Sequence, residues 1–401
     1  MRYNLYRQMV VQDKDDDITW ITVRGRHIPI KEGQSKEDAI NEAFNKNGEK
    51  SQKTDTKKSE KSSAPEKKDS KPLDNDKKSA ISNSGGGKIP KQYHSAYKQM
   101  MDTVHKSAET EVSVADAINS AVALSQKLGK GITREAIEAR MKRFDEYEKK
   151  AKTVKNDLGE PAKVDTKIKY SKGGKFVDGE YVGGEYTEER KAIQDKIINK
   201  LFENIEDKLP AKGEKPKLVI LGGRGGSGKS HFTKGDNAEY PAKNYVVIDP
   251  DAFKEQLPEY KDLVDSGDKY AGLNAWEVHE ESSDMKKDAL RTAMRFGANT
   301  VLDGTLAKTK SVLKVIDEFE KAGYDVEGAY MHLPREKSTA RGILRGMGNN
   351  ETGRMVPPKQ LLSMKNNEDN FQELMPRFKK WSIYNNDVPM GEKPKLVAKS
   401  E

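Results

Sequence analysis

The amino-acid sequence predicts an α/β fold: a P-loop kinase-like parallel sheet with helices on both faces, preceded by a small helical region and a disordered linker. Apolar strands alternate with helical stretches over residues 185–390, which is typical of a parallel sheet buried on both faces. A glycine-rich motif directly follows the first of these strands. Residues 47–92 contain almost no large apolar side chain and cannot form a core.

Composition limits the classes of function. Of 401 residues, 34% are hydrophobic and 34% are charged, so part of the chain is expected to be disordered. The net charge of +8 is spread among nearly as many acids, so no nucleic-acid partner is expected. The absence of cysteine excludes disulfides and thiolate metal sites. No apolar run approaches the ~18 residues of a membrane span, so we expect no membrane partner and a cytoplasmic location in a bacterial host.

The front of the chain divides into short regions. Residues 1–46 are expected to hold a β-hairpin, with strands at 18–23 and 26–30, and a helix at 35–45. The Lys- and Ser-rich linker 47–92 follows. Helical stripes predict a helical region over 93–155, with segments 93–105, 113–128 and a third from Ile132, and nothing in it suggests chemistry. Polar, glycine-rich residues 156–184 predict a second linker or a hairpin.

The catalytic domain is expected over residues 185–390, with a tail at 391–401. Thr187 is the predicted N-cap of its first helix. The expected strands are 218–221, 245–248, 300–302 and 326–332, and the main helices are 276–296, 310–322 and 336–345. In such folds, ligands bind at the carboxyl ends of the strands, so polar residues just after a strand are site candidates.

Residues 217–230 read KLVILGGRGGSGKS, an apolar strand running into a P-loop pattern. The backbone of this pattern binds phosphate oxygens, so the predicted nucleotide-binding residues are Gly223, Gly225, Gly226, Ser227, Gly228, Lys229 and Ser230. Lys229 supplies positive charge to the β- and γ-phosphates, and the Ser230 hydroxyl is placed to ligate Mg²⁺. A helix expected from Lys229 would add its positive N-terminal end. The alternative is a chance glycine-rich turn.

Acidic residues follow two further strands. Phosphoryl transfer needs a carboxylate that accepts the proton of the attacking hydroxyl, and either Asp249 or Asp251 can serve. We expect one of the two to be this base and the other to cap the helix that follows. Asp303 ends the next strand and is a candidate Mg²⁺ ligand; otherwise it caps a turn.

Two more clusters are candidates. His279, Glu280 and Glu281 open a long helix, where acids either interact with the helix dipole or recognise a polyhydroxylated substrate. Arg345 and Arg354 border a Gly- and Asn-rich segment and are expected to act as a lid that brings positive charge onto the γ-phosphate. Arg341 is expected on a solvated helix face.

The order of these motifs resembles the zeta-toxin family of P-loop kinases over roughly residues 185–370. The resemblance rests on TEERKAIQDKI, GGRGGSGKS, VVIDPDAFKEQLPEY, NTVLDGT and LRGMGNNETGRMVPPKQ. It implies a kinase that uses ATP or GTP with Mg²⁺. The best-known members phosphorylate the sugar 3′-hydroxyl of UDP-N-acetylglucosamine, and family toxins are usually held by a helical antitoxin that blocks the nucleotide site.

The resemblance also implies residue roles. Lys229 and Ser230 match the phosphate and magnesium residues, Asp251 matches the general base, and Arg345 and Arg354 match the arginines that clamp the ATP phosphates. Further matches and departures concern the acceptor side. Lys254 matches a basic residue that follows the base. Asp303 stands where many members have Glu before Gly-Thr, which adds Thr305 to the substrate candidates. Lys287 stands where a substrate-binding Glu is expected, and Glu281 is the candidate replacement.

Residues 18–40 resemble a short segment of phage head and minor structural proteins, which implies a phage or mobile-element origin and virion association. The sequence thus leaves three functions open: a small-molecule kinase, a virion-associated structural protein that binds nucleotide, and a polynucleotide kinase. A further hypothesis is that the helices of residues 93–155 inhibit the kinase in cis.

Overall fold

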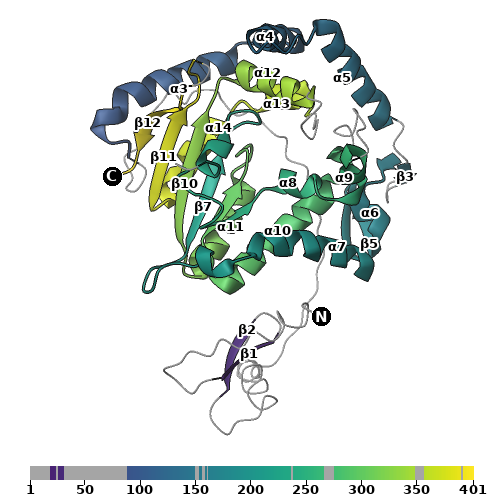
Figure 1. The fold of residues 1–401 in the computed structure, drawn as a ribbon, viewed down its shortest axis with the longest axis vertical. Helices are drawn as coiled ribbons and strands as arrows, with labels where there is room; N and C mark the ends of the chain where they lie inside the picture. The colour runs from purple at the N-terminus through teal and green to yellow at the C-terminus, as the bar shows by residue number, and fades with distance from the viewer. Residues whose placement is uncertain are drawn as a thin grey trace, which may run out of the picture. The chain divides into compact units, whose positions relative to one another are not determined.

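The computed structural model describes residues 19–23, 26–30, 88–149, 153–155, 159, 161–235, 238–265, 275–347, 356–389 and 392–401. The chain divides into residues 1–81 and residues 82–401 (Figure 1). In the first unit, β1 (Thr19–Val23) pairs antiparallel with β2 (Arg26–Ile30), which confirms the predicted strands. The predicted helix at 35–45 and most of the predicted linker lie outside the described residues.

A six-stranded sheet forms the centre of the second unit. Its strand order is β12-β11-β10-β7-β9-β8, and every pairing is parallel except that of the edge strand β12 with β11. The strands are β7 (Lys217–Gly222), β8 (Val246–Ile248), β9 (Thr300–Asp303), β10 (Asp325–His332), β11 (Lys380–Asn385) and β12 (Lys395–Lys399). The predicted α/β fold with a mainly parallel sheet is confirmed, while β11 and β12 were not foreseen.

Both faces of the sheet are buried. Alternate residues of β7 point to opposite faces: Leu218 and Ile220 join the larger core, and Val219 and Leu221 join a smaller one with Phe232 and Tyr240. The helices of this part are α7 (Glu188–Asn199), α8 (Pro250–Lys254), α9 (Pro258–Asp265), α10 (His279–Phe296), α11 (Lys310–Lys321), α12 (Arg335–Gly346), α13 (Pro358–Ser363) and α14 (Asn367–Leu374).

The strand order places a topological switch point at β7. The chain leaves β7 for β8 on one side of the sheet, and β10 lies on its other side, next to β7. The segments after β7 and β9 therefore meet at the same edge, because Leu221 pairs with Asp303 in register. Ligands of open α/β sheets bind in the crevice at such a point.

The helical region packs on the catalytic part as one compact unit. Its helices are α3 (His94–Glu109), α4 (Val114–Lys127) and α5 (Arg134–Lys149), and they follow one another past α12 and α13 (Figure 1). Ile118 and Ala121 of α4 share a core cluster with Ile343 and Leu344 of α12. Met100 of α3 joins the main core.

Much of the predicted linker 156–184 is ordered. It contains β4 (Pro161–Lys163), which pairs with β3 (Thr153–Lys155) just before it, then α6 (Thr166–Tyr170) and the hairpin of β5 (Ser171–Val177) with β6 (Glu180–Tyr186), which ends two residues beyond it. Lys167 forms an ion pair with Asp284 of α10 at 3.0 Å. The hairpin alternative is thus the one the structure supports. Among the described residues, no helix has the length and apolar character needed to cross a membrane.

Replacing Ile118 by Ala should lower the free energy of unfolding by about 2–5 kcal/mol, because Ile118 is buried between α4 and α12. If α4 and the sheet unfold together, one urea transition should shift as a whole. The control Val177→Ala removes an exposed side chain and should change stability by less than about 0.5 kcal/mol. A separate early transition for the helices would contradict a shared core.

Candidate active site

The loop after β7 adopts the conformation that binds phosphate with its backbone. Gly226 and Gly228 have φ of 86° and 94°, in the left-handed region that favours glycine. A Cβ at Gly226 would lie 2.6 Å from the carbonyl oxygen of Ser338 in α12. Asn386, which follows β11, donates from Nδ2 to the Ser227 carbonyl oxygen at 2.7 Å. The loop is therefore held in close contact with α12 on one side and with the end of β11 on the other.

Lys229 points back across this loop. Its Nζ donates to the Gly223 carbonyl oxygen at 2.8 Å and lies 3.6 Å from Asp303 Oδ1. The predicted helix from Lys229 is replaced by a short 3-10 turn, η4 (Lys229–Phe232). Four residues cannot build a helix dipole of useful size, so positive potential at this loop comes from Lys229 and the loop amides.

The structure separates the roles of the two acids after β8. Asp249 is the N-cap of α8, and its Oδ1 accepts a hydrogen bond from the Asp251 amide at 2.9 Å. The Asp251 side chain is 43% exposed and pairs with Lys254 Nζ at 3.0 Å. Asp249 is therefore the acid that caps the helix, which leaves the partly exposed Asp251 as the candidate base.

Asp303 is close enough to both of these acids for their charges to act on it. Burial raises the pKa of Asp303 to about 6, although 23% of its side chain stays exposed. The charge of Lys229 opposes this shift, and the charges of Asp249 and Asp251 add to it. Three carboxylates and two lysines, Lys229 and Lys254, thus share the edge of the sheet next to the phosphate loop.

This donor set fits Mg²⁺. In nucleotide enzymes this ion is bound by one or two carboxylates together with substrate phosphates and water, rather than by a full protein cage. Asp303 supplies a carboxylate of raised pKa, which a bound cation would stabilise in its charged form. Ser230 lies in η4, directly after the loop glycines, and is exposed to solvent, so its hydroxyl is accessible.

The predicted acceptor-side residues divide into two groups. The His279 side chain is exposed to solvent. The protein around it and the charge of Lys254 lower its pKa, while the charge of Asp251 acts in the opposite direction. Glu280 is exposed beside it, and Thr305 is half-buried after β9. His279 is therefore brought to the same edge as the candidate base.

Glu281 does not fit its predicted role in substrate binding. It is fully buried, and Arg190 of α7 donates to both of its oxygens at 2.7 and 2.6 Å. Gln194 donates to it as well, and Arg190 also binds Glu259 of α9. Its carboxylate has no direction left for a substrate hydroxyl, and it instead ties α7, α9 and α10 together.

The arginines also differ from expectation. Arg341 is half-buried, burial lowers its pKa, and its Cβ lies 3.2 Å from the position of a Cβ at Gly226. The prediction of a solvated face for Arg341 is therefore wrong. Arg345 lies one turn further along α12 and is partly buried. Arg354 and most of the predicted lid lie outside the described residues.

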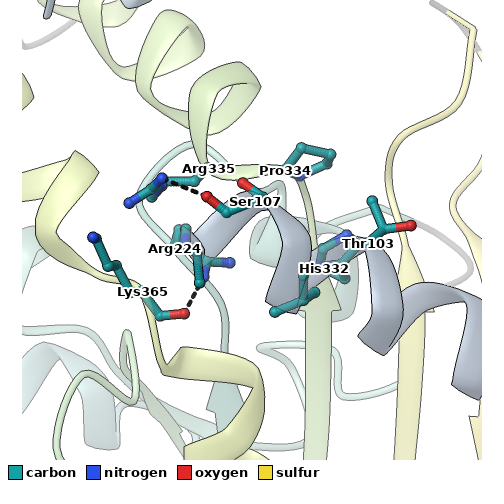
Figure 2. A pocket seen from close by; sticks show the side chains of 9 residues that line it. Thr103, Ser107, Arg224, His332, Pro334, Arg335 and Lys365 are labelled. Carbon is teal, nitrogen blue, oxygen red and sulfur yellow. Dashed lines mark hydrogen bonds between the residues drawn. The ribbon is translucent and has the colours of Figure 1, made fainter. Parts of the chain in front are cut away.

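Sequence reasoning missed a buried cluster behind the phosphate loop. Arg224, inside the loop, makes a two-pronged ion pair with Glu368 of α14, and His332 Nδ1 lies 2.8 Å from Glu368 Oε1. Figure 2 shows Arg224 and His332 beside a small cavity under α3, where Arg335 donates to the Ser107 carbonyl oxygen. The one signal of this cluster in the sequence was Arg224, a charged residue at a variable position of the P-loop pattern.

Comparison with known proteins agrees with this geometry. Residues 201–388 match the family model described as Zeta toxin. This match covers just under half of the chain. The chain is 29% identical over 142 residues to a toxin zeta of Enterococcus hirae, covering 35% of this chain and 48% of that protein. The chain spans about half the length of this relative.

Two further similarities extend the comparison. A calmodulin calcium-dependent NAD kinase of Arabidopsis thaliana is 35% identical over 107 residues, covering 25% of this chain and 20% of that protein. A solved structure from the PezAT chromosomal toxin–antitoxin system of Streptococcus pneumoniae aligns with a TM-score of 0.39 and 21% identity, over 51% of this chain and 79% of that one.

The close packing of the phosphate loop makes a sharp prediction. Gly226→Ala should cost more stability than Gly235→Ala and should abolish nucleotide binding. Both positions have φ near 90°, but only the new Cβ at Gly226 meets backbone atoms. We expect about 1–2 kcal/mol for the left-handed alanine at Gly235 and at least ~2 kcal/mol more at Gly226. Equal losses of melting temperature in the two variants would contradict the contact with α12.

The buried Glu368 predicts acid sensitivity. Although burial disfavours its charge, the hydrogen bond with His332 and the charge of Arg224 hold the pKa of Glu368 at about 2. Since this folded pKa lies below the usual 4.5, the stabilisation is present above pH 4.5 and is lost as the pH falls toward 2. Urea unfolding from pH 6 to 2.5 should show a loss of on the order of 2–3 kcal/mol that Glu368→Gln lacks. A parallel pH dependence in both proteins would refute this assignment.

Proposed function

We propose that the chain is a Mg²⁺-dependent kinase that transfers the γ-phosphate of ATP or GTP to a hydroxyl of a small molecule. The observation that carries this proposal is the arrangement at the edge of the sheet, where Lys229 of the phosphate loop lies 3.6 Å from Asp303 and Asp251 follows the next strand. A nucleotide-binding module without catalysis needs the loop, but it does not need a second, partly exposed acid beside it.

Each residue has a role in this reaction. The amides of the loop and Lys229 hold the β- and γ-phosphates. Mg²⁺, held by Ser230 and Asp303, would neutralise charge on the phosphate oxygens. Asp251 accepts the proton of the acceptor hydroxyl while the hydroxyl oxygen attacks the γ-phosphorus and the nucleoside diphosphate leaves. Arg345, with Arg354 beyond it, stabilises charge on the transferred group.

The acceptor is proposed to be a sugar hydroxyl of a nucleoside diphosphate compound. The family resemblance favours UDP-N-acetylglucosamine. The 35% identity to a plant NAD kinase favours a second candidate, the ribose hydroxyl of a dinucleotide. Lys254 is buried and pairs with Asp251, and its charge acts on His279, so the proposed acceptor side holds a lysine and a histidine next to the candidate base.

The cellular context follows from the similarity to toxin zeta proteins. An antitoxin is the proposed partner, and a toxic effect on the host is the proposed outcome of activity. The phage-like segment at residues 18–40 supports a mobile-element origin and leaves a phage structural partner as a further proposal.

The roles of the two acids after β8 give a direct test. Asp251→Asn should lower kcat by about 10²–10⁴-fold, because general-base catalysis contributes that much. Asp249→Asn is the matched control, since asparagine also caps a helix, and its kcat should fall by less than about tenfold.

Product formation would be followed by mass spectrometry with UDP-N-acetylglucosamine and NAD as acceptors. Undiminished transfer by Asp251→Asn would remove the base assignment. Phosphorylation of neither compound, with steady hydrolysis of ATP, would remove the proposed acceptor class.

A further inference from the structure

Helix α14 contacts both loops that form the candidate site. Asn367 donates from Nδ2 to the Thr305 carbonyl oxygen, and Asn370 donates to the Leu306 carbonyl oxygen at 2.7 Å. These contacts fix the segment that follows Asp303. One turn of α14 therefore holds the segment after Asp303 through two backbone carbonyl oxygens of that segment.

The same turn of α14 holds the phosphate loop through Glu368. Arg224 donates to both Glu368 oxygens, with the Nη2–Oε2 distance at 2.7 Å. Its Nε donates to the Met364 carbonyl oxygen at 2.9 Å. Arg224 and Glu368 are each 3% exposed, and His332 from the end of β10 completes the cluster. Charged groups buried this deeply are tolerated when they are paired and hydrogen-bonded, as they are here.

We propose that Arg224 and Glu368 are positioning residues, which fix the phosphate loop relative to the Asp303 segment through α14. The inference rests on the proposed function for its catalytic meaning. Neither residue touches the reacting atoms. A planar guanidinium with a two-pronged carboxylate partner restricts rotation of the loop in a way that a single ammonium contact cannot. The loop amides are then preorganised toward the phosphates before the nucleotide arrives.

Helix α3 extends this arrangement. His105 of α3 lies 2.9 Å from Asp369, and Tyr97 donates to Gln372 at 3.0 Å. Both partners are on α14. These two contacts of α3 thus fall on the helix that holds the phosphate loop.

The chain offers a matched control for the pair. Arg190 is also 3% exposed and also donates in two-pronged fashion to a buried glutamate, Glu281, but it lies in α7 and contacts no residue of the phosphate loop in the interactions described. Arg224→Lys and Arg190→Lys remove the same planar fork from equally buried sites. A general loss of stability should therefore be similar in both variants, whereas a positioning effect on the phosphate loop should appear only in Arg224→Lys.

The test measures backbone hydrogen exchange of full-length protein without nucleotide. In Arg224→Lys, amides of residues 225–230 should exchange at least about tenfold faster relative to those of β10, and in Arg190→Lys they should stay within about twofold of wild type. With Mg·ATP, the Kd should rise at least about tenfold for Arg224→Lys, while kcat at saturation changes less than about threefold.

Glu368→Gln keeps the shape of the partner and provides a second variant should Arg224→Lys fail to fold, with the same expected change in exchange. Unchanged exchange of the phosphate loop in the folded variants, or equal changes in the Arg190→Lys control, would overturn the inference. Because exchange is measured without nucleotide, a wild-type chain that binds no nucleotide would defeat the proposed function and leave the exchange result standing.

Discussion

The backbone contact between the phosphate loop and α12 is the constraint on which the rest of the site depends. With no side chain at Gly226, the loop approaches the Ser338 carbonyl oxygen closely enough to exclude even a methyl group. This fixes where the loop amides lie relative to the helix that carries Arg341 and Arg345. The loop and this helix therefore form one packed unit, in which neither can move without the other.

The charged groups behind the loop and in front of it differ in their partners. Behind the loop, Arg224 and Glu368 neutralise each other within the protein, so the carboxyl keeps its charge despite burial. In front of the loop, burial raises the pKa of Asp303 to about 6; the charge of Lys229 opposes this shift, and the charges of Asp249 and Asp251 add to it. A divalent cation at the front of the site would favour the charged form of Asp303, whereas the buried Glu368 behind the loop already has its cationic partner.

The sequence predicted the parts of this site that repeat in short motifs. The strand and glycine pattern predicted the loop after β7, and the IDPD run predicted that one of its two acids caps the helix that follows, which is Asp249. It failed where the interaction spans the chain. The Arg224–Glu368 pair joins residues 144 positions apart, and no local pattern distinguishes Glu368 from a surface glutamate. Glu281 was misjudged for the same reason, since its partner Arg190 lies 91 positions away. The strands β11 and β12 escaped because their burial depends on neighbours in the sheet rather than on their own periodicity.

The most direct measurement is a crystal structure of the full chain with Mg²⁺ and a non-hydrolysable ATP analogue. The account predicts the β-phosphate within hydrogen-bond distance of the amides of residues 225–230, the Lys229 ammonium turned from the Gly223 carbonyl oxygen toward the phosphates, and the Asp251 carboxylate facing the γ-phosphate. A nucleotide bound elsewhere, or phosphates in the loop with Asp251 turned away from them, would contradict it.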